Sequence, residues 1–263
     1  MYTDDGNVYK CLSNGYDSNS TVKPTGTANT SFYTEDGGAT DGYKWKYMYT
    51  IPSSTNTDFV TSDFITVETD ANVISTAVNG AIENVILTSN GGGYVAYLRD
   101  GIVNSVVNTT TLTITASIGS AILVDNSFNE AAIHFTSGDI NGTVRTIQSF
   151  VANTRTITLN EPISGMTSNS QSSEFDIMPA VNIFGDGTGA VAVANVDSLS
   201  NTITNIKVLN VGQDYSYSNV SITAANGFFT VGAQARAIIS PRKGHGSNAA
   251  EELGVEHFEI YKE

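Results

Sequence analysis

Apolar and polar residues alternate along much of the chain, with clear runs at Thr111–Thr115, Arg155–Asn160, Val181–Ile183 and Val220–Thr223. A period of two places apolar side chains on one face of a strand and polar side chains on the other, so these runs predict half-buried strands. Asn-Gly and Asp-Gly pairs, which favour tight turns, separate such runs along the chain. These pairs are Asn14–Gly15, Asp41–Gly42, Asn79–Gly80, Asn141–Gly142, Asp186–Gly187 and Asn226–Gly227.

Helical patterns are confined to two short segments. Residues Gly246–Gly254 have an N-cap candidate at Ser247, acidic residues early in the segment and a glycine stop at Gly254. The segment Thr57–Phe64 predicts a single turn. The pattern therefore predicts a mainly β protein with very little helix.

A weak internal repeat relates residues 80–94 to residues 201–215 at a constant offset. Each copy predicts a strand followed by a glycine turn with a positive φ, after which a tyrosine folds back onto the sheet. The aligned pairs are Ile82 with Ile203, Val85 with Ile206, Leu87 with Val208, Gly91 with Gly212, and Tyr94 with Tyr215.

The region between the two copies predicts a separate β module. Residues Ile133–Ile147 predict a strand, a glycine-containing turn region and another strand, and Arg155–Leu159 and Ser173–Ile177 add further strand patterns. We therefore expect a β-sandwich-like domain built from the glycine-rich repeat, formed by residues 1–99 plus 179–263. We expect a smaller β module, residues 100–178, to interrupt it.

The charge balance excludes some partners. The formal net charge is −14, with 26 Asp and Glu against 12 Lys and Arg, which argues against nucleic-acid binding because phosphate neutralisation needs clustered cations. No apolar run is long enough for a membrane span, and Met1–Lys10 lacks the apolar core of a secretory signal.

The candidate catalytic and metal-binding side chains fail the spacing tests that their chemistry requires. Cys11 is interpreted as a small half-buried side chain, because only Lys10 nearby would activate a thiol. His134, His245 and His257 lack the spacing of a zinc site. No G-x-S-x-G elbow is present, although a triad or a carboxylate pair assembled across the fold stays open. We predict no catalytic, cofactor-binding or metal-binding residues and no enzymatic activity.

Three loops invite a ligand interpretation. Gly185–Ala190 suggests a phosphate loop, but it leads into an alternating strand pattern rather than a helix, which favours a turn between strands. Asp125–Glu130 and Asp4–Gly6 are rich in oxygen ligands for calcium, but neither has EF-hand spacing. Surface turns are the preferred interpretation for both.

The densest aromatic segment is 41–52, which contains the single tryptophan. Alternation places Tyr43, Trp45, Tyr47 and Tyr49 on one strand face, and it places the side chains of Lys44, Lys46 and Met48 on the other. Interleaved aromatics and lysines could bind nucleic acid. The acidic net charge instead favours a buried aromatic face, in the core or against another subunit.

Several segments resemble one family of phage proteins. Val8–Leu12, Ser20–Gly26, Asp41–Ile51 and Phe59–Val67 resemble the baseplate wedge subunit, the gene product eight class, of contractile-tailed, myovirus-like and cyanophage-like bacteriophages. Further similarity lies in the glycine-rich Gly185–Ala190 and Gly212–Tyr215 and in the closing segment Ser240–Gly254.

The resemblance implies a structural component of the phage tail baseplate wedge that mediates assembly between subunits. It implies a homodimer that joins other baseplate wedge proteins, without a cofactor, a nucleic acid or a membrane. It implies location in the virion tail baseplate after assembly in the host cytoplasm. Family members have a region before Val8–Leu12 and continue beyond the equivalent of Glu263, so a fragment, a truncated reading frame or a compact variant is expected.

An alternative function is a carbohydrate-binding or glycan-cleaving tail module. Such a module requires a groove with two carboxylates about 5–10 Å apart beside exposed aromatic side chains. A structural subunit should instead present a flat or apolar exposed patch.

Overall fold

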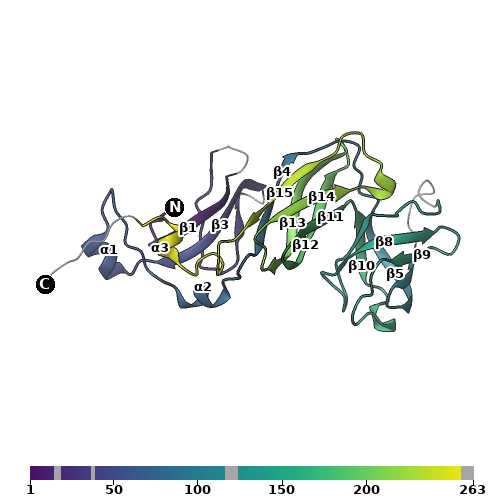
Figure 1. Ribbon diagram of the computed structural model, residues 1–263, viewed down its shortest axis with the longest axis horizontal. Coiled ribbons are helices and arrows are strands. Elements are labelled where there is room, and N and C mark those ends of the chain that lie inside the picture. The colour runs from purple at the N-terminus through teal and green to yellow at the C-terminus, as the bar shows by residue number, and fades with distance from the viewer. Residues whose placement is uncertain (15–18, 37–38, 116–123, 256–263) are drawn as a thin grey trace. The chain divides into compact units, whose positions relative to one another are not determined.

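The computed structural model describes residues 1–14, 19–36, 39–115 and 124–255. The chain is mainly β with few helices, which confirms the predicted fold class (Figure 1). The first strands are β1 (Asn7–Asn14), β2 (Phe32–Asp36), β3 (Ala39–Thr50), β4 (Ile82–Ser89), β5 (Leu98–Asn108), β6 (Thr111–Thr115), β7 (Ala132–Phe135) and β8 (Val144–Val151). The later strands are β9 (Thr156–Leu159), β10 (Glu174–Met178), β11 (Ala180–Gly185), β12 (Thr188–Asp197), β13 (Thr202–Gln213), β14 (Ser218–Thr223) and β15 (Gln234–Ile239).

The chain divides into two compact units, and each contains separate chain segments. The first unit comprises Met1–Asn84, Gln213–Ser216 and Ile238–Glu263. The second unit comprises Val85–Gly212 and Tyr217–Ala237. The predicted boundaries at 99/100 and 178/179 remain a prediction.

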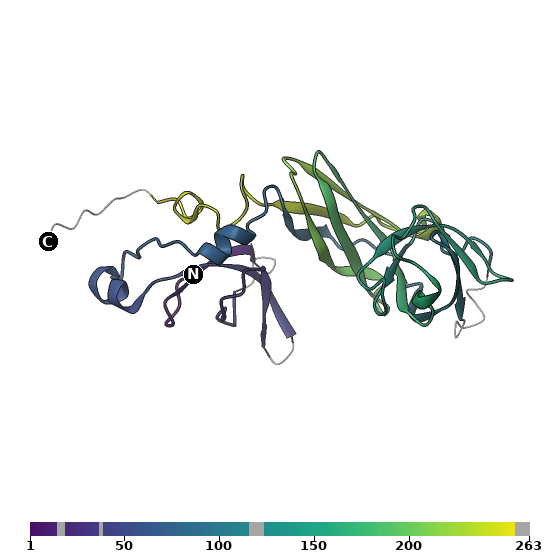
Figure 2. The same cartoon turned by 90° about the horizontal axis from the view of Figure 1, so that it is seen from below.

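The first unit contains a three-stranded antiparallel sheet in the order β1-β3-β2 (Figure 2). Its central strand β3 is buried on both faces from Lys44 to Tyr49. The N-terminal residues cover part of the outer edge of β1, because Met1 and Tyr9 exchange main-chain hydrogen bonds. The sheet is open, since it has a first and a last strand.

Six strands between Leu98 and Met178 form a closed barrel in the order β10-β5-β6-β9-β8-β7. Alternation predicted β6 and β9 correctly: Leu112, Ile114, Ile157 and Leu159 are buried, while the threonines between them are partly exposed. The core also contains Phe128, Phe135, Phe150 and Phe175. The two central rings, Phe128 and Phe150, lie 4.7 Å apart between centroids.

The repeat copies contribute to a second closed barrel, in the order β11-β12-β13-β4-β15-β14. The colours of Figure 1 show that β4 comes from a much earlier part of the chain than its green and yellow neighbours. The sequence predicted a sandwich-like arrangement here, whereas the sheet closes on itself because β11 pairs with both β12 and β14. Closure leaves this sheet without the edge strands that a sandwich would have.

The internal repeat is visible in the structure, although Gly212 lies within β13 and not in a turn after the strand as predicted. The two strands pair antiparallel with Val85 opposite Ile206, which are aligned positions of the two copies. Gly91 and Gly212 have φ values of +64° and +61°, and Tyr94 and Tyr215 are buried.

Main-chain hydrogen bonds repeat the same relation. The Tyr94 amide donates to the Asn201 carbonyl at 2.9 Å, and the Tyr215 amide donates to the Gly80 carbonyl at 3.1 Å. Gly80 and Asn201 are aligned positions, and both have positive φ. The two copies are therefore related by an approximate two-fold axis between β4 and β13.

The helices are α1 (Ser53–Phe59), α2 (Ala71–Thr76) and α3 (Ala249–Glu252), with short 3₁₀ turns at Ser168–Ser170 and Ala225–Gly227. The turn predicted at Thr57–Phe64 is wrong in its bounds, because α1 begins directly after Pro52, a residue compatible with a helix start. Helix α2 was not predicted, although Asp70 caps it by accepting from the amides of Asn72 and Val73.

Helix α3 lies inside the segment predicted to be helical, but its cap differs. The Asn248 side chain, not Ser247, accepts from the Glu251 amide at 3.2 Å. Gly254 has a φ of +67° just beyond the end of the helix, which is the glycine stop that the sequence predicted.

The turn predictions hold at Asn79–Gly80, Asn141–Gly142, Asp186–Gly187 and Asn226–Gly227. Asp41–Gly42 is wrong as a turn, because it lies within β3. The register runs from Tyr33 opposite Lys44 to Glu35 opposite Thr40, so β3 has extra residues there and Gly42 takes a φ of +84°. Gly15 lies outside the described residues.

Candidate functional site

The aromatic segment predicted from the sequence forms β3, and most of its side chains are buried. Trp45 and Tyr47 are 4% and 3% exposed and belong to one apolar cluster with Tyr9 and Val73. The rings of Tyr9 and Tyr47 meet edge to face at 5.9 Å, and the rings of Tyr43 and Trp45 stack at 5.6 Å. A buried aromatic face is confirmed, and an exposed stacking platform for nucleic acid is not what β3 provides.

Tyr49 does not share the face of Trp45 and Tyr47, contrary to the alternation prediction. It packs with Val8 and Met48 in a different cluster. Val8 lies opposite Tyr49 and Tyr9 lies opposite Tyr47, so β3 has one extra residue between these pairs. This bulge reverses the side-chain alternation beyond Tyr47.

A buried charged cluster occupies the other side of β3. The Lys44 ammonium donates to the Glu83 carbonyl and lies 5.1 Å from the centroid of the Tyr33 ring. The Lys46 ammonium donates to the Asn29 carbonyl at 2.6 Å and lies 3.8 Å from Glu83 Oε1. Lys46 thus forms an ion pair with the buried Glu83 carboxylate, while Lys44 is bound by the main chain of the same residue and feels the charge of that carboxylate.

The cluster has two electrostatic consequences. Burial lowers the pKa of Lys44 to about 8, although the Glu83 charge acts in the opposite direction. Glu83 Oε2 is buried and has no hydrogen-bond partner among the described residues. Glu83 was not predicted from the sequence, because a single glutamate in the mostly apolar run Ala81–Leu87 matches no motif for a charged site.

Asp41 connects the irregular segment after residue 18 to the sheet. Its carboxylate accepts from the Ser20 hydroxyl, the Thr21 amide, the Thr34 hydroxyl and the Tyr43 amide. Burial alone would raise the pKa of Asp41, but these hydrogen bonds lower it to about 2. This carboxylate therefore has a structural role at neutral pH.

A second buried carboxylate, Glu252 of α3, fastens the segment 240–254 to β1. Its Oε2 accepts from the Lys10 ammonium at 3.0 Å and is 2.7 Å from His245 Nδ1, while Oε1 accepts from the Gly246 amide at 2.5 Å. Burial acts to raise the pKa of Glu252, but the hydrogen bonds from His245, Lys10 and Gly246 lower it below its ordinary value. We call Lys10, His245 and Glu252 the carboxylate clasp.

The histidines and the cysteine do not form a catalytic arrangement among the described residues. His245 Nε2 is buried and has no hydrogen-bond partner there, so no hydroxyl or thiol is in place beside it. His134 lies in β7 opposite Asp176 of β10, and burial lowers its pKa. Cys11 is exposed rather than half-buried, because it lies on the edge strand β1. His257 lies outside the described residues.

The three loops behave as turns. Asp186–Gly187 joins β11 to β12, which confirms the strand-turn-strand interpretation of Gly185–Ala190. Asp125 accepts from the Ala152 amide at 2.7 Å, and Asp4 forms an ion pair with Lys23 at 2.6 Å. Within the described part of the chain, no group of three or more His, Cys, Asp or Glu side chains could hold a metal ion.

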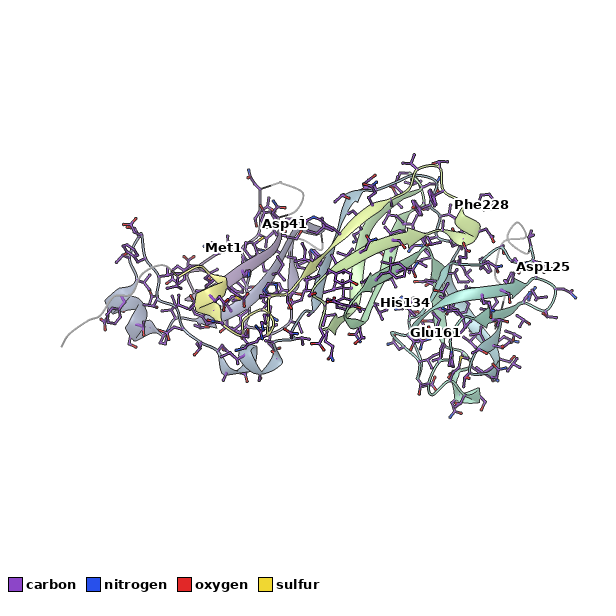
Figure 3. All side chains as sticks on the ribbon, in the orientation of Figure 1. Met1, Asp41, Asp125, His134, Glu161 and Phe228 are labelled. Atoms are coloured by element: carbon purple, nitrogen blue, oxygen red, sulfur yellow. The ribbon has the colours of Figure 1, made fainter. Side chains whose placement is uncertain are left out.

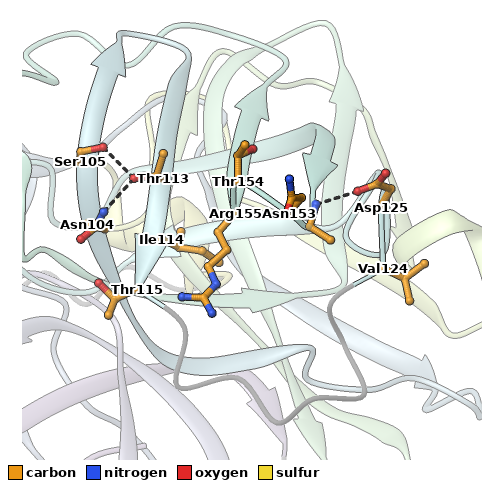
Figure 4. A pocket seen from close by; sticks show the side chains of 11 residues that line it. Asn104, Ser105, Thr113, Ile114, Thr115, Val124, Asp125, Asn153, Thr154 and Arg155 are labelled. Atoms are coloured by element: carbon orange, nitrogen blue, oxygen red, sulfur yellow. Dashed lines mark hydrogen bonds between the residues drawn. The ribbon is translucent and has the colours of Figure 1, made fainter.

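A pocket of about 1060 Å³ lies on the barrel formed by β5–β10 (Figure 4). Thr113 accepts hydrogen bonds there from Asn104, and its hydroxyl pairs with that of Ser105. Asp125 is the one carboxylate among the residues that line this pocket. A second pocket, of about 280 Å³, likewise has one lining carboxylate, Glu161. Neither has the paired carboxylates that a glycosidase groove requires.

A comparison with known proteins identifies a relative of one part of the chain. Residues 6–132 match the family described as Bacteriophage T4, Gp8. This range covers slightly less than half of the chain and runs from the N-terminal sheet to the start of β7. The match confirms the resemblance found in the sequence, and it supports a baseplate wedge subunit of the gene product eight class. No curated protein and no solved structure matches the chain. In the described residues, no helix is long and apolar enough to cross a membrane.

Proposed function

We propose that this chain, whose residues 6–132 match the Gp8 family of bacteriophage T4, is a structural subunit of a phage baseplate wedge that mediates assembly with other wedge proteins. The observation that carries the proposal is this match, because it includes the whole three-stranded sheet. We propose that the subunit forms a homodimer, lies in the tail of the virion and assembles in the host cytoplasm.

The chemistry of the described side chains agrees with a structural role. The carboxylates of Asp41 and Glu252 accept hydrogen bonds from within the chain, and the buried Glu83 forms an ion pair with Lys46. Each of these groups fixes one chain segment against another instead of facing a pocket. No observation on the described residues favours the carbohydrate alternative, since Trp45 is buried and both pockets have a single carboxylate.

We also propose that residues 100–178 form a module inserted into a domain made of residues 1–99 and 179–263. The proposal is supported by the position of the β5–β10 barrel, whose strands all lie between Leu98 and Met178. Replacing residues 100–178 with a short flexible linker tests it. A folded product that retains the Trp45 fluorescence of the parent is expected, and an unfolded product would contradict the proposal.

Assembly is tested by mixing the purified chain with each of the other wedge proteins of the same phage. Light scattering after size-exclusion chromatography gives the mass of the free chain and of each mixture. We expect a dimer mass alone and a stable complex with at least one wedge protein. A chain that remains separate from every wedge protein would refute the assembly role.

A further inference from the structure

The segment Ser53–Asp70, which we call the acidic arm, repeats one short motif. Thr57–Val60 and Ser62–Ile65 both read as a hydroxyl residue, aspartate, phenylalanine and an aliphatic residue. The apolar residues of the second copy are well exposed: Phe64 is 53% and Ile65 is 41% exposed. Adjacent exposed apolar side chains of this size are typical of an interaction site rather than of a free surface.

The base of the arm is held in place, so its tip has a defined conformation. The Tyr2 hydroxyl donates to Asn56 Oδ1 at 3.0 Å, and the Tyr49 hydroxyl donates to the Thr66 carbonyl at 3.1 Å. Val60 and Val67 pack against the cluster of Val8, Met48 and Tyr49. An arm anchored at both ends of its tip loses little conformational entropy when it binds.

The tip itself is a hydrogen-bonded turn. The Thr61 amide donates to the Phe64 carbonyl at 2.9 Å, and the Phe64 amide donates to the Thr61 hydroxyl at 3.1 Å. This closed turn presents Phe64 and Ile65 next to each other beside Asp63. Asp63, Phe64 and Ile65 are thus consecutive exposed residues, so the two apolar side chains lie close to an acidic one.

Helix α1 lacks the usual internal sources of stability. It has seven residues, none of them buried, no side-chain N-cap, no acidic residue in the first turn and no basic residue in the last turn. A helix of this length is marginal by itself in water. Contacts with a partner would add to the stabilisation that the Tyr2–Asn56 hydrogen bond provides.

Charge indicates what kind of partner fits. The arm contains Asp58, Asp63, Glu68 and Asp70, and no lysine or arginine occurs between Lys46 and Arg99. A surface that carries only negative charge is complementary to a basic rim and repels a like-charged surface. Two arms from two copies of this chain, whose net charge is −14, would repel each other.

We propose that the acidic arm inserts Phe64 and Ile65 into an apolar pocket rimmed by Lys and Arg on another baseplate wedge protein, and not on a second copy of this chain. The inference rests on the proposed structural function and names the surface and the kind of partner. The aspartates border the contact, and the apolar pair fills it.

The test measures binding of the full chain to each purified wedge protein of the same phage by biolayer interferometry. The tip variant is Phe64→Ser with Ile65→Ser. Its matched control is Phe228→Ser with Val231→Ser, because these residues are also exposed, at 77% and 59%, and lie between β14 and β15. Figure 3 labels Phe228. We expect the dissociation constant of the tip variant to rise by at least about tenfold, as for loss of two buried apolar side chains, and that of the control to stay unchanged.

The charge contribution is measured separately. Asp58→Asn with Asp63→Asn should slow association several-fold at low salt, and raising the ionic strength from about 0.05 M to about 0.5 M should remove the difference from wild type. The control is Asp139→Asn with Glu161→Gln, which changes two exposed acids outside the arm. It should leave the association rate unchanged at both ionic strengths.

The outcomes separate this inference from the proposed function. Failure of the wild-type chain to bind any wedge protein overturns both. Binding by the wild type with an unchanged tip variant overturns the arm inference and leaves the assembly role standing. Loss of self-association in the tip variant, seen as a monomer mass by light scattering, would make a second copy the occupant and would also overturn the inference.

Discussion

The N-terminal sheet and the β5–β10 barrel use different means to fill their interiors. The barrel core consists of apolar side chains, including four phenylalanines, and its sheet closes without an edge. The three-stranded sheet is open, and it buries Lys44, Lys46 and Glu83 together with Trp45 and Tyr47. An apolar closed barrel needs little beyond its own residues, whereas an open sheet with buried charges depends on segments from far along the chain.

The difference between the two regions distinguishes interactions that fix the positions of chain segments from interactions that stabilise the fold. A buried ion pair is a weak source of net stability, but it penalises any arrangement that separates the partners. Lys46 with Glu83 and Lys10 with Glu252 each join residues distant in sequence. We therefore interpret the sheet as the region where the chain specifies its segment arrangement, and the barrel as the region where it gains apolar stability.

The largest expected effect comes from truncating the aromatic core of each region. Trp45→Ala should destabilise the sheet by about 3–5 kcal/mol, as for other large buried aromatics. Phe150→Ala, in the barrel core, should have a similar effect on the barrel. Urea unfolding followed by far-ultraviolet circular dichroism measures both.

Because Trp45 is the single tryptophan, its fluorescence in the parent and in Phe150→Ala reports on the sheet. For Phe150→Ala, we expect the midpoint of urea unfolding measured by Trp45 fluorescence to match that of the parent. The midpoint measured by circular dichroism should fall. An unchanged melting temperature for Trp45→Ala would contradict the burial of this side chain and would revive a ligand-binding role.

Removing the Glu83 carboxylate tests whether the buried charges contribute to the stability of the sheet. Glu83→Gln keeps the shape of the side chain but leaves Lys44 and Lys46 without a counter-charge, and it should cost about 3 kcal/mol. The matched control is Glu161→Gln at the barrel surface, which should change stability by less than about 0.5 kcal/mol. Equal melting temperatures for the two variants would refute the dependence of the sheet on this charge.

The positive-φ glycines of the repeat test the second barrel. A Cβ at Gly212 would lie 2.5 Å from the Ala190 amide nitrogen, so Gly212→Ala should cost about 2 kcal/mol or more through clash and backbone strain. Gly142 has φ +80° and open space around it, so Gly142→Ala should cost about 1 kcal/mol. Thermal melts of both variants measure the two losses of stability. Equal losses would contradict the close approach of Gly212 to the Ala190 main chain.

The smallest effect concerns the carboxylate clasp and depends on pH. Glu252→Gln should cost about 1.5 kcal/mol at neutral pH, since hydrogen bonds to a charged group are lost. The pKa of Glu252 is lowered in the folded state, so its contribution is present above the unfolded pKa and is lost as the pH falls through the folded pKa. The difference between the melting temperatures of parent and variant should therefore begin to shrink once the pH falls below the ordinary glutamate pKa of about 4.3, and it should vanish at more acidic pH. A constant difference down to acidic pH would contradict a charged clasp.

Local pattern predicted much of the fold. The alternation at Thr111–Thr115 and Arg155–Asn160 identified two strands and their buried faces, because the apolar residues there face the core and the threonines between them face away from it. The repeat alignment identified two glycines with positive φ and two buried tyrosines. These features depend on nearby residues or on a period of two, and both are visible in a sequence.

Features set by distant contacts could not be predicted in the same way. The bulge that separates Tyr49 from Tyr47 depends on how β1 pairs with β3, and closure of the repeat barrel depends on β11 meeting β14. The burial of Lys44 and Lys46 depends on Glu83 and Asn29, which have no signature in the sequence. Helix α2 is an exception, since Asp70 directly before the helix is an N-cap signal that is visible in the sequence.

The paired hydrogen bonds of the repeat have a mechanical consequence. Tyr94 bonds to Asn201 near one end of the β4–β13 pair, and Tyr215 bonds to Gly80 near the other end. A pulling force along these antiparallel strands is applied in shear, so the bonds at both ends resist it together instead of opening one after another. The chain should therefore be stiffest along that strand direction.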